Sequence, residues 1–421
     1  MASPSLWLYR GLMAVSLPLL APFLLVADRR RGKRRPPWVQ RLGRRLPEIP
    51  SGGVWVQAVS VGEVAVARPL LAELKRRHPA VPTVLSATTS TGLAMASGAQ
   101  LADVTLPFPV DLPGPVRRLM RAAAPRLVVL VETELWPELL AACGSGGIPV
   151  ALVNARVSDR SFAGYRAIRS LLRPLLRPIS VALAQTEQDA ARLATIGVPG
   201  ERVRVTGNVK FDASPPGAPP RVLDELRRLA AGRPVLVAGS TMAGEENLVI
   251  EAVLRLPEGR RPFLLLAPRH PERASDVLQL ASAAGLPAVR RTLFAEAPAP
   301  CAAVVLDTVG ELAALFQLAD VAYIGGSLVP TGGHNPIEPA RFGVPVLSGP
   351  HVRNFAAVYQ SFVAAGGARI VRSSQELAEA LAEWLADPAR ARAAGNAGLR
   401  LLEKNAGATA RTVDALEPFL R

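Results

Sequence analysis

The stretch "VWVQAVSVGEVAVARPL", Val54–Leu70, decides the fold, because it joins two different hydrophobic patterns without a break. Its first residues form the continuous apolar run of a buried strand, and its later residues follow a helical pattern. A buried strand followed at once by a helix is typical of a parallel sheet with helices on both faces. Glu63 lies at the junction, where its carboxylate either stabilises the helix as a first-turn acid or acts as a general base.

The same alternation of apolar runs and amphipathic stretches recurs along the chain. The strand candidates are residues 53–59, 82–88, 126–132, 148–154, 180–186 and 202–208, then residues 233–240, 261–268, 301–307, 321–327, 344–350 and 368–373. Between the two groups, "ASPPGAPP" (213–220) suits neither a helix nor a central strand, and we interpret it as a linker. The sequence therefore predicts two doubly wound, Rossmann-type α/β domains, 36–212 and 221–421, with the final helices available to pack back on the first domain.

Composition narrows the class of protein. The chain has 421 residues, enough for two domains, and 49% of them are hydrophobic, which excludes global disorder. The formal net charge of +15 indicates an anionic partner, but aromatic residues make up only 5% and are not interleaved with the basic segments. That pattern argues against nucleic acid. The two cysteines, Cys143 and Cys301, form neither a disulfide framework nor a metal-ligand spacing.

The N-terminus indicates a membrane contact. Gly11–Ala27 is apolar and uncharged, and the basic run Arg29–Arg35 follows it. The apolar segment is short for a spanning helix and contains Pro18 and Pro22, so it either spans the bilayer or lies in its surface. We predict that residues 1–35 anchor the protein at the cytoplasmic face of a membrane, where the basic flank meets anionic lipid.

Polar residues gather where the strands of the first half end. In such domains ligands bind at the carboxyl ends of the strands, so we expect the site in a cleft between two facing domains. Glu132 and Glu134 directly follow the apolar run "LVVLV", and one of them could simply begin the next helix. Lys210 of "TGNVKFD" either pairs with Asp212 or stabilises negative charge that develops in a reaction.

Two motifs of the second half have similar alternatives. Arg269 of "APRHPER" ends a strand and suits phosphate binding, or an ion pair between the domains. Gly310 and Glu311 of "DTVGEL" fit a ligand-binding loop or a simple turn before a helix.

The most specific stretch is "GGSLVPTGGHNPIEPA", residues 325–340. Asn335, Pro336 and Glu338 fit an N-cap, a proline in the first turn and the acid of a capping box. The glycine pairs before them would let a ligand approach the backbone, and the helix N-terminus would attract a phosphate. A nucleotide is the ligand that this pattern favours, with Glu338 accepting from ribose hydroxyls.

Several motifs are missing from the sequence. It contains no P-loop, no G-x-S-x-G elbow, no zinc spacing among its histidines and no D-x-D pair for a metal–diphosphate. We therefore expect chemistry that needs neither a metal nor a cofactor.

Taken together, "SVGE", "ETELWP", "NAR", "VKFD", "PRHPER", "GEL", "GGSLV" and "GGHNPIEP" resemble the 3-deoxy-D-manno-octulosonic acid (Kdo) transferases. These are GT-B glycosyltransferases of Gram-negative lipopolysaccharide biosynthesis, and the resemblance runs essentially from end to end. One departure is Met242 in "GSTMAGEE", where the family leads us to expect a histidine.

The resemblance implies a GT-B-like fold and inverting, metal-independent transfer of Kdo from CMP-Kdo to a hydroxyl of the lipid A precursor, lipid IVA. It implies that Glu63 is the general base and that Glu132 and Lys210 support the transition state. The dipole of the helix that Glu63 begins would keep its carboxylate ionised, which is the state that a base needs. The CMP site that it implies consists of Pro268, Arg269, Val309, Gly310, Glu311, Asn335, Pro336, Ile337 and Glu338.

Two other readings compete with this one. Another GT-B-type sugar-nucleotide enzyme, such as an epimerase, would need no membrane anchor. A non-enzymatic basic scaffold on a membrane would give no reason for so many motifs at strand ends.

Overall fold

The structure is a computed structural model that describes residues 3–16, 38–212 and 220–421. Residues 4–16 are helical, whereas residues 17–37, which hold most of the predicted anchor and its basic run, lie outside the described residues. The linker predicted at 213–220 also lies outside them, except for its last residue. Among the described residues, no helix is both long and apolar enough to cross a membrane.

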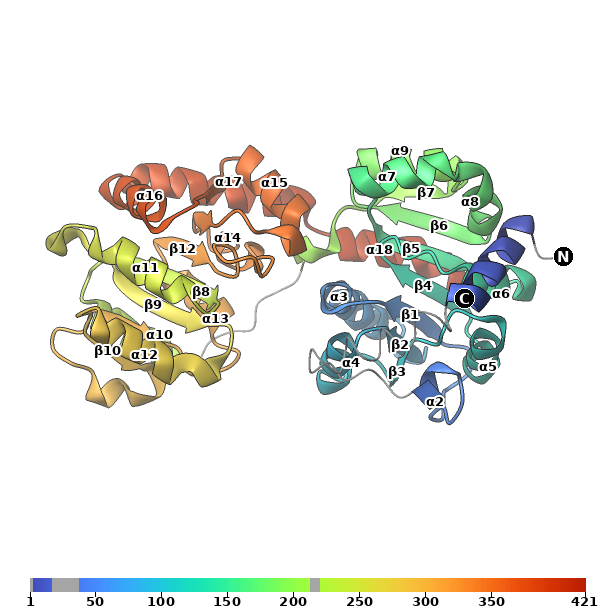
Figure 1. The fold of residues 1–421 in the computed structure, drawn as a ribbon, viewed down its shortest axis with the longest axis horizontal. Coiled ribbons are helices and arrows are strands. Elements are labelled where there is room, and N and C mark those ends of the chain that lie inside the picture. Colours follow the sequence, from blue (N-terminus) through green and yellow to red (C-terminus); the bar gives the residue numbers. More distant parts are fainter. Residues whose placement is uncertain (1–2, 17–37, 213–219) are drawn as a thin grey trace. The chain divides into compact units, whose positions relative to one another are not determined.

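The chain divides into two compact units (Figure 1). The first comprises Met1–Ala213 and Asn405–Arg421, and the second comprises Ser214–Lys404. The last helix of the chain therefore packs on the first unit. The sequence pattern allows for this packing of the final helices.

In the described residues, the first unit contains a sheet of seven parallel strands in the order β3-β2-β1-β4-β5-β6-β7. Their bounds are β1 (Val54–Ala58), β2 (Thr83–Ala87), β3 (Val104–Pro107), β4 (Leu127–Val131), β5 (Val150–Ala155), β6 (Ile179–Ala184) and β7 (Val203–Val205). All strand candidates of this half are confirmed. The sequence missed β3, because "VTLP" is a four-residue edge strand with half-exposed residues at its start.

Helices cover both faces of this sheet, as the continuous apolar strands require. They are α2 (Trp38–Arg41), α3 (Val61–Arg77), α4 (Ser90–Gly98), α5 (Pro113–Ala123), α6 (Pro137–Gly146), α7 (Asp159–Ala167), α8 (Arg169–Leu176), α9 (Glu187–Ile196) and α18 (Ala408–Leu416). One core packs α3, α4 and α18 against the sheet, for example through Leu70 and Leu416. The other packs α5, α6 and α9, for example through Leu119 and Leu193.

The second unit repeats the plan, with seven parallel strands in its described part in the order β10-β11-β9-β8-β12-β13-β14. The strands are β8 (Val235–Thr241), β9 (Phe263–Pro268), β10 (Ala288–Arg290), β11 (Ala303–Val305), β12 (Val321–Ile324), β13 (Val346–Ser348) and β14 (Ala368–Ile370). The helices are α10 (Pro220–Ala230), α11 (Glu245–Leu254), α12 (Ala274–Ala283), α13 (Leu312–Leu315), α14 (Ile337–Ala340), α15 (Ala356–Ala364), α16 (Ser374–Ala386) and α17 (Pro388–Asn405).

Short 3₁₀ turns connect several of these elements. They are η1 (Gly200–Arg202), η2 (Val209–Asp212), η3 (Glu258–Arg260), η4 (Pro271–Arg273), η5 (Arg291–Glu296), η6 (Phe316–Leu318), η7 (Arg353–Phe355) and η8 (Glu417–Phe419). Two of them, η2 and η5, carry residues that bear on the site.

The strand orders locate a switch point in each unit, where successive connections run to opposite sides of the first strand. It lies between β1 and β4 in the first unit and between β8 and β12 in the second. In open parallel sheets, ligands bind at the carboxyl ends of the two strands that flank this point. Each switch point therefore marks where that unit's functional residues are expected.

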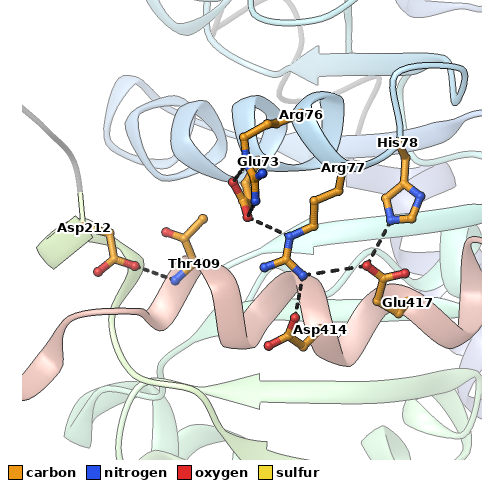
Figure 2. A network of polar contacts seen from close by, with 8 residues as sticks. All are labelled: Glu73, Arg76, Arg77, His78, Asp212, Thr409, Asp414 and Glu417. Atoms are coloured by element: carbon orange, nitrogen blue, oxygen red, sulfur yellow. Dashed lines mark hydrogen bonds and ion pairs between the residues drawn. The ribbon is translucent and has the colours of Figure 1, made fainter.

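A polar network fixes α18 to the first unit (Figure 2). Arg77 at the end of α3 contacts Asp414 at 2.5 Å and Glu417 at 3.7 Å, and His78 Nε2 lies 3.0 Å from Glu417 Oε1. At the other end of α18, the carboxylate of Asp212 accepts from the backbone N–H groups of Gly407 (2.8 Å) and Thr409 (2.5 Å). Asp212 thus acts as an N-cap supplied from outside the helix, since Gly407 has no side chain to do so.

Replacing Asp212 should therefore loosen α18. We expect Asp212→Ala to lower the free energy of unfolding by about 0.5–2 kcal/mol, the usual cost of a lost cap. Asp414→Ala is the matched control, because it removes a 62% exposed partner of a surface ion pair that is worth about 0–1 kcal/mol. Urea unfolding of both variants tests this, and a larger loss for Asp414→Ala would contradict the capping role.

Candidate active site

Glu63 lies at the β1/β4 switch point, in the first turn of α3, and is only 7% exposed. Its carboxylate accepts from the N–H of Val59 (2.6 Å) and from the hydroxyl of Ser60 (3.0 Å). Its pKa is raised to about 7, mainly by burial; the charges of Glu134 and Glu132 add to the rise, and the hydrogen bonds from Val59 and Ser60 oppose it. Desolvation therefore works against the ionised form that the sequence led us to expect for this first-turn acid. A pKa near working pH suits a general base.

Glu132 and Lys210 contact each other. Glu132 directly follows β4 with φ +59°, a left-handed conformation that few residues other than glycine adopt. Lys210, in η2, places its Nζ 3.0 Å from Glu132 Oε1, and both side chains are largely shielded. Asp212, the partner that the sequence left open for Lys210, instead caps α18. The structure therefore joins two candidate residues that lie far apart in the sequence.

Glu134 completes an acidic cluster, which we define as Glu63, Glu132 and Glu134. Burial raises the pKa of Glu134, and the charge of Glu132 raises it further. Burial also raises the pKa of Tyr165, with Glu134 adding to the effect. The negative charge within the cluster therefore adds to burial in favouring the protonated form of Glu63 and of Glu134.

Asn154 is a site residue that the sequence did not single out, although it belongs to the "NAR" motif. It is fully buried and has φ +53°. Its Oδ1 accepts from the N–H of Val209 at 3.0 Å, next to Lys210, and its carbonyl accepts from Gln185 at 3.0 Å. Its Nδ2 finds no hydrogen-bond partner within the described part of the chain. Asn154 thus holds η2 in place beside the cluster.

Glu245 has the corresponding place at the β8/β12 switch point, and the sequence did not single it out either. It begins α11 and is fully buried. Its carboxylate accepts from the N–H groups of Met242, Gly326, Ser327 and Leu328, at 2.6–2.9 Å. It also accepts from the hydroxyl of Tyr323 at 2.9 Å. The sequence signal that could have pointed to Glu245 is the motif "GSTMAGEE", which follows an apolar strand. Only the folded chain brings this motif to residues 325–333, which we call the glycine loop.

The glycines of residues 325–333 serve the packing of this loop. A Cβ on Gly325 would lie 2.6 Å from the carbonyl oxygen of Ser240, and one on Gly332 would lie 2.6 Å from the Asn354 amide. Both positions are therefore filled by the protein itself. The expectation that these glycines leave room for a ligand is wrong, because the loop folds against its own unit.

Residues 335–338 also differ from their predicted arrangement. Asn335 Oδ1 accepts from the N–H of Ile337 at 3.1 Å, while its amide donates to Glu338 Oε1 at 3.2 Å. Glu338 therefore accepts a hydrogen bond from the side chain of Asn335. In a capping box it would accept from the backbone N–H of Asn335 instead. Pro336 occupies the N-cap, and α14 is only four residues long, so its dipole is weak. Burial raises the pKa of Glu338.

Arg269 follows Pro268, the buried last residue of β9, and its side chain is exposed. Burial lowers the pKa of His334, and the charges of Arg269 and His270 lower it further, while Glu245 opposes this. Arg269 is therefore close to His334, which follows the glycine loop. This position suits a residue that binds a phosphate beside the loop. The neighbouring His270 Nδ1 lies 3.4 Å from Glu272 Oε1, whereas Arg269 forms no ion pair within the described part of the chain and is exposed, so its charge is available to an anion.

In the segment 309–311, the first two residues are exposed to solvent and the third forms an ion pair. Val309 is 85% exposed, and Gly310 has φ +90° with open space where a Cβ would point. Glu311, in contrast, makes a two-pronged contact with Arg291 at 2.9 and 2.7 Å and accepts from Thr308 at 2.5 Å. Arg291, in η5, is a neighbour that the sequence did not reveal. Among the described residues, no group of three or more His, Cys, Asp or Glu could hold a metal ion.

Two solved structures share the fold over most of the chain. UDP-GlcNAc 2-epimerase from Neisseria meningitidis, bound to UDP-GlcNAc, matches with a TM-score of 0.56 and 15% identity, over 87% of this chain and 100% of that one. Alr3699/HepE from Anabaena, in complex with UDP, matches with a TM-score of 0.55 and 12% identity over the same shares. At such low identity the likeness establishes the fold alone: two parallel-sheet α/β domains of the GT-B type.

Sequence relatives identify the family within this class. Residues 36–213 match the family described as 3-Deoxy-D-manno-octulosonic-acid transferase (kdotransferase). The 3-deoxy-D-manno-octulosonic acid transferase of Bordetella pertussis is 39% identical over 98% of this chain and 99% of its own length. That of Haemophilus influenzae is 34% identical over 98% of both chains. The chain belongs to the 3-deoxy-D-manno-octulosonic acid transferase family, as its motifs indicated, and it is a glycosyltransferase.

Proposed function

We propose that the protein transfers Kdo from CMP-Kdo to a hydroxyl of the lipid A precursor lipid IVA, with inversion and without a metal ion. Family membership supports the Kdo transfer, since two relatives of nearly full length are Kdo transferases. The observation that carries the chemistry is Glu63, a buried carboxylate at a switch point whose pKa is raised to about 7.

In this mechanism the bond between the anomeric carbon of Kdo and the CMP phosphate oxygen breaks, and its electron pair leaves with CMP. A hydroxyl oxygen of the acceptor forms the new bond on the opposite face, which inverts the configuration. Glu63 takes the hydroxyl proton, while Val59 and Ser60 hold its carboxylate in place. Lys210, positioned by Glu132, supplies a fixed positive charge near the transition state.

The second unit would hold the CMP moiety. Arg269 offers an exposed cation for the phosphate, beside a loop that Glu245 anchors. Val309 and Gly310 form an open surface, and Glu311 holds Arg291 next to it. Together with Pro268 and the segment Asn335–Glu338, these residues form the site that we propose for CMP.

We further propose that the protein works at the cytoplasmic face of the inner membrane, anchored through residues 1–35. The basic run Arg29–Arg35 would contact anionic lipid there. The N-terminal helix (residues 4–16) supports this location, because Trp7, Leu12 and Val15 are 61–66% exposed on it. Large apolar side chains exposed on one short helix are unfavourable in water and favourable at a lipid surface.

The direct test is to incubate the purified protein with CMP-Kdo and lipid IVA, with and without a metal chelator. We expect release of CMP and a matching gain in the mass of the lipid, unchanged by the chelator. The proposal fails if CMP is not released and the lipid keeps its mass. Activity that disappears with the chelator would overturn the metal-independent mechanism alone.

Lys210→Ala should affect the reaction more than donor binding. We expect the transfer rate to fall about 10²-fold, because one preorganised charge is lost, while CMP affinity stays within about two-fold. Lys75→Ala is the matched control, since Lys75 forms a similar 2.8 Å pair with Asp103 at the surface of the same unit. Equal rates in the two variants would remove Lys210 from the reaction.

A further inference from the structure

A pocket of about 870 Å³ lies in the first unit, under the N-terminal helix and between α5, α6 and α8. Its wall includes Leu6, Met120 and Ile148, and Arg117, Arg121 and Arg177 also line it, all three with exposed side chains. Its volume is within the range of pockets that hold small-molecule ligands. No residue of the acidic cluster lines it, so it is separate from the candidate active site.

The helix that roofs this pocket is held by two buried carboxylates, and it lies beside α6 (Figure 1). Tyr9 donates to Asp111 at 2.9 Å, and Arg10 makes a two-pronged contact with Glu138 at 2.5 and 2.9 Å. Asp111 also accepts from the first backbone N–H groups of α6, at 3.1 and 3.0 Å. Because Glu138 neutralises Arg10, the positive charge that a ligand meets comes from the other three arginines.

We propose that this pocket binds one anionic phospholipid of the membrane. The lipid phosphate lies against Arg117, Arg121 and Arg177, and one acyl chain lies along Leu6, Met120 and Ile148. Only an amphiphile satisfies both parts of the lining, since a free phosphate would leave the apolar wall in water. The N-terminal helix that covers the pocket also carries exposed apolar side chains, so at the membrane location proposed above it brings the pocket close to such lipids.

Two other possible occupants of the pocket complement the positive charge of its arginines less well than an anionic lipid does. Residues 17–27 of the same chain are apolar but contain no acidic residue, and the segment Arg29–Arg35 that follows brings six more positive charges. A second copy of the protein carries a net charge of +15 and would be repelled by the arginines. An anionic lipid complements both the arginines and the apolar wall.

The test measures binding of phosphatidylglycerol and of phosphatidylcholine to the full-length protein in detergent, by native mass spectrometry. We expect phosphatidylglycerol to bind preferentially, and Arg121→Glu/Arg177→Glu to weaken it roughly ten-fold or more. Arg392→Glu/Arg400→Glu is the matched control: it makes the same charge change on exposed positions of α17 and should leave binding within about two-fold. Equal binding of the two lipids, or equal loss in both double variants, would overturn the proposal.

A photo-crosslinking residue in place of Ala141, which also lines the pocket, identifies the occupant directly. An adduct with phosphatidylglycerol supports the proposal. An adduct with residues 17–37, or with a second copy of the chain, overturns it. Neither measurement needs CMP-Kdo, so lipid binding can fail while Kdo transfer succeeds, and the reverse.

Discussion

Glu63→Gln should abolish Kdo transfer, with a loss of about 10²–10⁴-fold, and leave CMP binding intact. The amide has nearly the same size and keeps an oxygen that can accept from Val59, but it cannot take a proton from the acceptor hydroxyl. Transfer rates measured beside CMP affinity by calorimetry separate the two effects.

Glu187→Gln is the matched control for this substitution. Glu187 is also a first-turn acid of a helix in the first unit, but it is exposed, so we expect transfer within about two-fold of the unsubstituted protein. If Glu63→Gln stays active, Glu63 is not the base. If it folds but loses CMP binding, Glu63 acts in donor binding.

The pKa of Glu63 also predicts how activity and stability depend on pH. Only the ionised carboxylate accepts a proton, so kcat/KM should rise with pH through about 7. The folded-state pKa lies above the ordinary value of 4.5, so the folded protein binds the proton more tightly, and ionisation costs stability as pH rises from about 4.5 to 7. Glu63→Gln should therefore gain about 1–3 kcal/mol over the unsubstituted protein between pH 4 and pH 8, measured by denaturant unfolding.

Glu245→Ala should have the largest effect on stability. It removes the acceptor for the N–H groups of Gly326 and Ser327, which stay buried, and for that of Leu328, which is partly buried. At about 1–3 kcal/mol for each buried group left unsatisfied, we expect a loss of about 3–5 kcal/mol. CMP affinity should fall with it, because this loop leads into Asn335–Glu338. Denaturant unfolding and calorimetry measure both quantities.

Two further variants sharpen this prediction. Glu245→Gln keeps one acceptor oxygen and should recover part of both losses. Glu251→Ala, on the same helix, removes an exposed partner of Arg255 and should change neither stability nor CMP affinity measurably. A Glu245→Ala protein as stable as the Glu251→Ala protein would show that the loop does not depend on Glu245.

The class of fold was determined by the sequence itself. Continuous apolar runs such as Val54–Ala58 and Leu127–Val131 specify strands buried on both faces, and each is followed by a helical pattern within a few residues. Both signals are local, so they can be read without knowing what packs against them. The sequence pattern did not predict β3 or the three-residue β10. Both are short strands at the edge of a sheet, and their hydrophobic pattern is too brief to recognise.

The family was likewise determined by local motifs, and so were the positions of Glu63, Glu132, Lys210 and Arg269 near strand ends. Their partners were not. Lys210 forms an ion pair with Glu132, which lies 78 residues earlier in the sequence. Glu245 accepts hydrogen bonds from backbone N–H groups that lie 81–83 residues later. Such pairings arise only when the sheet brings its switch-point strands together.

Tertiary structure also raised the pKa of Glu63 and gave the glycines their place in the packing of the loop. From the sequence, the acid at the start of α3 looked ionised, and the glycine pairs looked like room for a ligand. Desolvation depends on everything that surrounds a carboxylate, and free space depends on what fills it. Both are properties of the packed molecule, so only the folded chain could show that Glu63 has a pKa of about 7 and that the loop fills its own space.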